Sequence, residues 1–175
     1  MKRFVLFLVL TGALASTARA ATTYPTSAWD KQWLQTSISG DRFEIMGGKI
    51  ALNKSSSEAV RALGQRLISD HTKSLHESIA LAHRIGIKVP KDPTPSMQWE
   101  LMMVSQLNGS SFDYNYSKLE VYDHSQDIEE SKAEASDGTN TLVRQAAKKA
   151  LPMLTMHLML SKHALAASPA PSTAG

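Results

Sequence analysis

The amino-acid sequence predicts an all-α protein, an antiparallel four-helix bundle with a short extra helix between helices two and three. Three observations indicate this architecture. Helix start and stop signals recur along the chain, whereas the alternating pattern of a strand is almost absent. Four long segments carry apolar residues at helical spacing. Short connections between most of these segments favour antiparallel neighbours.

The first 20 residues have the pattern of a secretory signal peptide. MKRFVLFLVLTGALASTARA contains two basic residues, an apolar run and a small-x-small site, so we expect cleavage after Ala20. The apolar run is too short for a stable membrane span, and no later segment reaches the required length. We therefore expect a periplasmic or secreted protein without a transmembrane span after cleavage.

Charge and cysteine content exclude several classes of function. Cleavage would remove Lys2, Arg3 and Arg19, which leaves 16 basic and 16 acidic residues. Because no basic stripe occurs elsewhere, we expect no nucleic-acid partner. The chain has no cysteine, so disulfides, thiolate ligands and covalent haem attachment are excluded. A metal ion would therefore be held by His, Asp, Glu or water.

Local signals place the helices in chain order. After a leader at 21–26, the first long helix is predicted over 27–54. Ser55 stands three residues before Glu58, a capping-box pattern that predicts the start of the second helix. That helix reaches Ile85, because Gly86 is a typical stop signal.

The second half of the chain has further turn signals. A loop at 87–95 leads, through Thr94 and Pro95, into a short helix to about residue 107. Turn residues at 108–111 and 137–139 begin two more long helices, which end near 136 and 167. The bundle domain is thus predicted over 27–167, and residues 168–175 form a tail with the composition of a disordered segment.

Two histidines lie at the centres of apolar helix faces. At about 100° per residue, His71 is surrounded by apolar residues of the second helix, whereas His76 and His83 fall on its polar side. Asp70 lies at the rim of the buried face, where we expect a surface ion pair with Arg66. His157 is central to the apolar face of the last helix, which Pro152 should bend.

The other two long helices leave alternatives open. In the third, His124 shares a face with Asp113 and Glu120, while Phe112, Leu119 and Tyr122 occupy the opposite face. Either face fits the bundle interior. In the first helix, Glu44 lies in a row of small residues that permits close approach of a neighbouring backbone. Its alternative is an exposed Glu on a weakly amphipathic helix.

Four segments resemble a known family. These are FEIMGGKIAL at 43–52, AVRALGQRLISDHTKSLHESIALAHRIGIKVP at 59–90, FDYNYSKLEVYDHSQDI at 112–128 and ALPMLTMHLMLSKHAL at 150–165. Together they are similar to the ferritin-like secreted bacterial family catalogued as domain of unknown function 4142, over roughly 27–166. The family's motifs fall on Glu44, Asp70, His71, Asp113, Tyr116, His124, Pro152 and His157. The resemblance implies the bundle fold and favours an inward His124.

An inward His124 would complete a candidate metal site. Each long helix then contributes a polar group to the interior, an arrangement from which bundle metal sites are built. The candidate ligands are His71, His124, His157, Glu44, Glu120 and Asp113, and the candidate ions are iron, zinc, copper and manganese. Glu-x-x-His, which the usual ferritin-like di-iron site contains twice, is absent, which argues against oxygen-activating or ferroxidase chemistry.

The alternative is a module without any ligand. Buried imidazoles can hydrogen-bond to Asp113, Glu120, Glu44 or Tyr116, and such a network fixes the register of the helices. In that case the protein would have a structural role or bind a protein partner in the cell envelope.

Overall fold

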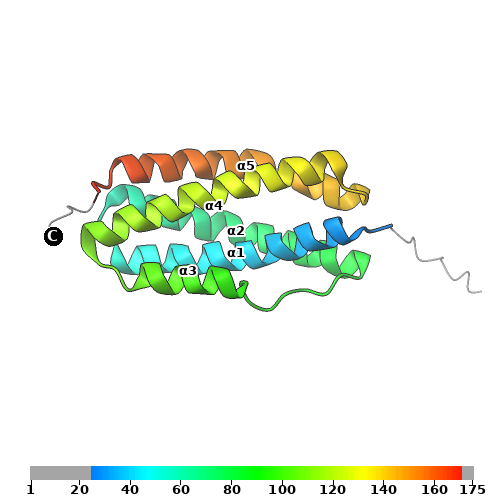
Figure 1. Cartoon of the computed structure of the whole chain (residues 1–175), viewed down its shortest axis with the longest axis horizontal. Coiled ribbons are helices and arrows are strands. Elements are labelled where there is room, and N and C mark those ends of the chain that lie inside the picture. The colour runs from blue at the N-terminus through cyan, green and yellow to red at the C-terminus, as the bar shows by residue number, and fades with distance from the viewer. Residues whose placement is uncertain (1–24, 171–175) are drawn as a thin grey trace, which may run out of the picture.

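The structure is a computed structural model that describes residues 25–170, and these contain five helices and no strand. The helices are α1 (Ala28–Lys54), α2 (Glu58–Ile85), α3 (Pro95–Ser105), α4 (Gly109–Asp137) and α5 (Thr141–Ala166). The predicted bundle with a short extra helix is confirmed (Figure 1). The predicted signal peptide, together with residues 21–24 and 171–175, lies outside the described residues. None of the described helices is both long and apolar enough to cross a membrane.

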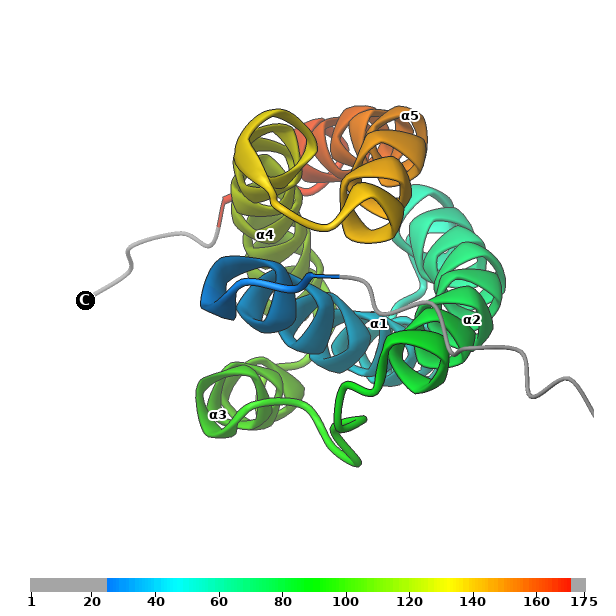
Figure 2. The same cartoon turned by 90° about the vertical axis from the view of Figure 1, so that its right-hand side faces the viewer.

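The four long helices surround a common interior, and α3 packs on the outside against α1 and α4 (Figure 2). Around the bundle, α1 contacts α2 and α4, and α5 contacts the same two helices. Neighbouring helices are antiparallel. At one end of the bundle, Asp30 at the start of α1 contacts Asn140 in the turn between α4 and α5, and at the other end Lys54 of α1 contacts Asn108 at the start of α4. The α2 and α4 helices run in the same direction, so α3 and its loop form the single long crossover (Figure 1).

Helix ends follow the sequence signals with one correction. Thr94 accepts a hydrogen bond from the Met97 amide and Pro95 opens α3, as predicted, while Gly86 ends α2 in the left-handed conformation at φ 74°. The predicted capping box at Ser55 is wrong. The Ser55 hydroxyl accepts from the Ser57 amide instead, and α2 begins at Glu58 without a side-chain cap. A serine side chain that closes a local turn is not available to cap.

Two apolar clusters fill the ends of the bundle. One contains Trp33, Leu34, Ile38, Ala82, Ile87, Val143 and Ala147, and the other contains Ala51, Val60, Leu63, Leu67, Phe112, Tyr116 and Ala164. Along α1, α2 and α5 the buried polar residues Glu44, His71 and His157 lie between these clusters in sequence. The bundle therefore carries a polar layer that is closed off from solvent by apolar packing on both sides.

The first two helices approach closely at a pair of glycines. A Cβ atom on Gly48 would lie 2.6 Å from the Gly64 carbonyl oxygen, and one on Gly64 would lie 2.9 Å from the Gly48 oxygen. The predicted close approach along the small residues of α1 is confirmed, and Glu44 on this face is fully buried. Both Asp41 and His71 lie two turns from this contact, so the glycines set the register that brings them together.

The chain remains packed just beyond α5, which ends at Ala166. Ser168, which we placed in the disordered segment, is buried, and its hydroxyl donates to the Ala164 carbonyl oxygen. The hydroxyl satisfies one of the carbonyl groups that a helix end leaves free. Ordered structure therefore reaches at least Ser168.

Buried carboxyl groups join three helices where α4 leads into α5. Asp30, near the start of α1, accepts from the Thr139 and Asn140 amides at 2.8 and 2.9 Å. Glu134, near the end of α4, is fully buried beside it. Burial and the neighbouring Asp30 carboxylate raise the pKa of Glu134 to about 7. Folding therefore favours the protonated form of Glu134.

This raised pKa predicts a pH-dependent stability. A carboxyl whose folded pKa lies above its unfolded value contributes stability below the unfolded pKa of about 4.5, and this is lost as pH rises through about 7. Glu134→Gln, which mimics the protonated group, should be more stable than wild type by about 1–3 kcal/mol at pH 8 and nearly equal at pH 4.5. Urea unfolding at both pH values measures this. The same change at the exposed Glu129 is the control, and equal effects of the two variants would contradict the prediction.

Candidate metal centre

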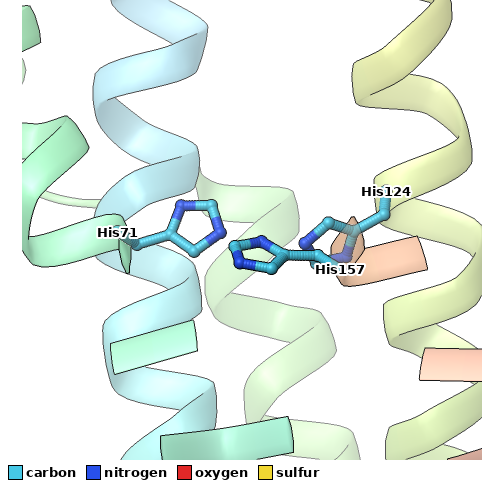
Figure 3. A group of neighbouring side chains, drawn as sticks. All are labelled: His71, His124 and His157. Atoms are coloured by element: carbon cyan, nitrogen blue, oxygen red, sulfur yellow. The ribbon is translucent and has the colours of Figure 1, made fainter. Parts of the chain in front are cut away.

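Three imidazole rings converge in the polar layer. His71 comes from α2, His124 from α4 and His157 from α5, and the rings point toward one another (Figure 3). Their centroids are 5.0 to 5.9 Å apart, and none of the three residues is more than 2% exposed. One ring nitrogen from each lies within 4.8 Å of the others. A tetrahedral ion with bonds near 2 Å needs nitrogens about 3.3 Å apart, so small rotations would complete the site.

Each ring is held by one hydrogen bond to a neighbouring oxygen. Nδ1 of His71 donates to Asp41 of α1 at 2.9 Å, and Nε2 of His157 donates to Asp70 of α2 at 3.0 Å. Nδ1 of His124 donates to the Glu120 carbonyl oxygen one turn earlier, at 2.9 Å. Carboxylate or carbonyl acceptors of this kind orient metal-binding histidines and fix the tautomer that leaves the other nitrogen free.

The second nitrogen of every ring has no hydrogen-bond partner. These atoms are Nε2 of His71, Nε2 of His124 and Nδ1 of His157, and all are buried. An unpaired buried polar atom costs free energy, commonly about 1–3 kcal/mol. Three such atoms in one interior layer could together bind a metal ion through their lone pairs.

Two of the rings, His124 and His157, are also in the protonation state that metal ions require. Burial, together with the other two histidines, lowers the pKa of His124 to about 3. Burial and His71 lower that of His157 to about 4, although Asp70 acts in the opposite direction. Both imidazoles are therefore neutral at pH 7 and can donate a lone pair.

A pair of carboxyl groups lies beside His124. Glu44 of α1 and Glu120 of α4 are fully buried, and their oxygens lie 4.0 and 3.6 Å from His124 Nδ1. Burial and the neighbouring carboxylates raise the pKa of Glu44 well above its usual range. Burial also raises that of Glu120, to about 8. The pair therefore retains at least one proton at pH 7.

His124 cannot serve both groups of potential ligands in its present tautomer. Glu44, Glu120 and His124 form a second set with donor atoms within 4.8 Å. However, Nδ1, the atom near the carboxylates, is already a hydrogen-bond donor to the Glu120 carbonyl. Only Nε2 remains free, so the three histidines are the better-formed ligand set, and the two glutamates are neighbours that can add an oxygen.

The structure brings together most of the predicted site residues. The inward orientation of His124, which the family resemblance favoured, is confirmed, and Tyr122 on the opposite face is 62% exposed. Phe112 is also buried, contrary to its assignment to that opposite face, because it stacks on Tyr116 at the start of α4. Asp113 is buried but belongs to neither ligand set, since it lies two turns, or about 10 Å, before Glu120.

The adjacent residues Asp70 and His71 do not bond to each other. Asp70 makes the predicted ion pair with Arg66 at 2.6 Å, but it is more than a surface residue because it also accepts from His157 of another helix. The partner of His71 is Asp41, which sequence reasoning placed only beside Glu44. The available signal was the three-residue spacing of Asp41 and Glu44, which puts both on one face of α1. His76 and His83 are exposed, as predicted.

These features define a class: a four-helix bundle with a buried layer of histidine and carboxylate groups. The chain belongs to the family described as "Domain of unknown function (DUF4142)", whose sequence profile matches residues 15–164. The resemblance seen in the sequence is therefore confirmed. A comparison with curated proteins gave no match.

A solved structure shares the fold. It is described as "Crystal structure of DUF305 fragment from Deinococcus radiodurans" and superposes with a TM-score of 0.71 at 13% sequence identity. The match covers 82% of this chain and 99% of that one. At this level of identity the similarity shows the all-α architecture alone.

Proposed function

We propose that the protein is exported and binds one transition metal ion in the cell envelope through His71, His124 and His157. The observation that carries this proposal is the difference in hydrogen bonding between the two nitrogens of each ring. Each ring has one nitrogen held by an oriented acceptor and one buried nitrogen with no partner. This is the arrangement of metal-binding histidines with their supporting hydrogen bonds.

The ligand chemistry narrows the candidate ions. Three imidazoles suit zinc, copper and iron, and carboxylate oxygen from Glu44 or Glu120 can complete four-coordination or accommodate manganese. The site lies in the bundle interior between two apolar clusters, so the ion would be screened from bulk water. Binding and sequestration of an ion fit this buried position.

The alternative, a ligand-free hydrogen-bond network, fits the same residues less well. Such a network should pair most of its buried polar atoms. Here each imidazole makes a single hydrogen bond, and all four side-chain oxygens of Glu44 and Glu120 have no partner. A bound cation would resolve both the unpaired nitrogens and the adjacent acidic pair.

Metal titration tests the proposal. The protein is expressed through its own export route, its bound metals are measured, and the stripped protein is titrated with Zn²⁺. We expect one ion per chain, and His71→Ala and His157→Ala should each weaken binding by at least about 100-fold because a ligand is lost. Bound zinc should also raise the unfolding temperature of wild type, since a ligand at about 100 times its Kd adds about 2.7 kcal/mol.

Two comparisons make this result specific. His76→Ala and His83→Ala remove exposed imidazoles from the same helix and should leave zinc affinity unchanged. A metal-free protein whose unfolding temperature does not respond to zinc, copper, iron or manganese would contradict the metal proposal. If His71→Ala and His157→Ala then lower stability without any metal effect, the network alternative is supported.

A further inference from the structure

A small internal chamber adjoins the three histidines on the side of His71. Its volume is about 30 Å³, and residues of α1, α2, α4 and α5 line it. One water-sized group needs about 10–15 Å³ of such volume, so the chamber has room for about two. His71 and Asp41 contribute to its wall, and each has a buried atom without a partner, Nε2 and Oδ2 respectively.

The lining of the chamber suits a cation. Three carboxyl groups, from Asp41, Asp127 and Glu130, face it together with the hydroxyl side chains Thr36, Ser37, Ser74 and Ser131. No lysine or arginine occurs among the described residues of its wall. Carboxylates and hydroxyls are oxygen donors that can replace part of the water shell of a divalent ion.

The chamber adjoins a groove on the surface. The groove, of about 450 Å³, runs between α2 and α5 and includes Asp70, the acceptor for His157. Its lining also contains Arg66, which pairs with Asp70, Lys149, which pairs with Glu77, and Lys73. Five residues line both spaces and form the neck between them: Trp33, Ser37, Ser74, Ala150 and Met153. The groove therefore lies next to the chamber that Asp41 and His71 line, whereas apolar clusters close the bundle toward both ends.

We infer that this neck and chamber are the access passage for the metal ion, and that the chamber is a transit site for a divalent cation on its way to the three imidazoles. This inference rests on the proposed function. The ion reaches the groove, passes Ala150 and Met153, and exchanges water for the carboxylate and hydroxyl oxygens of the chamber. From there His71, whose free nitrogen belongs to the ligand set, is the first imidazole it meets.

A substitution that narrows the neck tests the passage. Ala150 is half-buried, so Ala150→Trp adds bulk there without touching a ligand. Uptake of Co²⁺ by the metal-free protein is followed by visible absorbance, and release is followed after addition of excess EDTA. If the ion enters and leaves by the neck, both rates fall together by about 10-fold or more while Kd is unchanged. Ala150→Leu, a smaller change, should show the same effect in weaker form and serves if the Trp variant does not fold.

A second variant tests the acidic lining. Glu130→Gln keeps the size of the side chain but removes the negative charge of an exposed carboxylate from the wall of the chamber. Uptake should slow by about 3- to 10-fold at low salt, and the difference from wild type should shrink at high salt because the attraction is screened.

The control uses the same helix seam at its other end. Ala62→Trp adds an indole to a separate groove between α2 and α5, which shares no residue with the neck. Its uptake and release rates should match those of wild type. Unchanged rates in both Ala150 variants, with metal still bound, would overturn the passage and leave the metal site standing. Absence of Co²⁺ binding by wild type would overturn the proposed function itself.

Discussion

Replacing Gly48 with alanine is expected to destabilise the protein by about 3 kcal/mol or more. The added Cβ would lie 2.6 Å from the Gly64 carbonyl oxygen and 2.8 Å from Ile68 Cγ1. Ile68 can rotate, but the Gly64 oxygen belongs to the backbone of α2, so the two helices must move apart. Forced repacking of this kind commonly costs about 1–3 kcal/mol, and a backbone clash belongs at the upper end. Urea unfolding at pH 7 measures the change.

Gly40→Ala is a matched control in the same helix. Gly40 is buried, yet a Cβ there would contact only Met97 Cε, at 3.9 Å. Because alanine favours helix over glycine by about 1 kcal/mol, this variant should equal or exceed wild type in stability. If Gly48→Ala behaves like Gly40→Ala, the close approach of α1 and α2 at this point is not what the structure indicates.

The glycine contact should also affect the metal site. Gly48 and Gly64 lie two turns from Asp41 and His71, so separation of α1 from α2 would lengthen the 2.9 Å hydrogen bond between them. Loss of a supporting hydrogen bond typically lowers metal affinity by about 10- to 100-fold. We therefore expect weaker zinc binding in Gly48→Ala even under conditions where the variant remains folded.

Asp30→Ala is the second substitution with a large expected effect. The Asp30 carboxylate accepts from the Ser27 amide and hydroxyl at 2.6 Å and from the Thr139 and Asn140 amides. It thereby joins the start of α1 to the turn between α4 and α5. Its removal leaves buried amides unpaired, so we expect a loss of about 3 kcal/mol and a fall in Tm of about 10 °C.

Two further variants resolve the Asp30 effect. Asp30→Asn retains an oxygen acceptor without the charge and should lose roughly half as much stability. Asp92→Ala removes an exposed carboxylate and should change stability by less than about 0.5 kcal/mol. Thermal unfolding of the three variants provides the comparison. Similar Tm values for Asp30→Ala and Asp92→Ala would show that the buried hydrogen bonds contribute little.

Most of the fold could be predicted because helices are determined locally. The spacing of apolar residues, Thr94-Pro95 and Gly86 placed the helix boundaries within a few residues of those observed. The positions of His71 and His157 around their helices were sufficient to predict that both rings are buried. The first two helices owe their register to Gly48 and Gly64, whose close approach the row of small residues in α1 already indicated.

The partners of the histidines could not be predicted in the same way. His124 has carboxylates on its own face but apolar side chains opposite, so periodicity alone did not orient α4. The predicted cap at Ser55 was wrong because two alternative hydrogen bonds to nearby residues compete for the same hydroxyl, and the local sequence permits both. Asp70 and His71 are adjacent, yet successive residues of a helix point in directions about 100° apart, so they reach different neighbours.

By itself, therefore, the sequence determined an all-α bundle without cysteine and the inward histidines of α2 and α5. Tertiary structure alone decided which oxygen holds each ring: Asp41 for His71, Asp70 for His157 and the Glu120 carbonyl for His124. It also decided that a small chamber with carboxyl groups in its wall lies against His71. The reason is that helix formation depends on residues within a few positions, whereas these contacts depend on the rotation and register of helices distant in sequence.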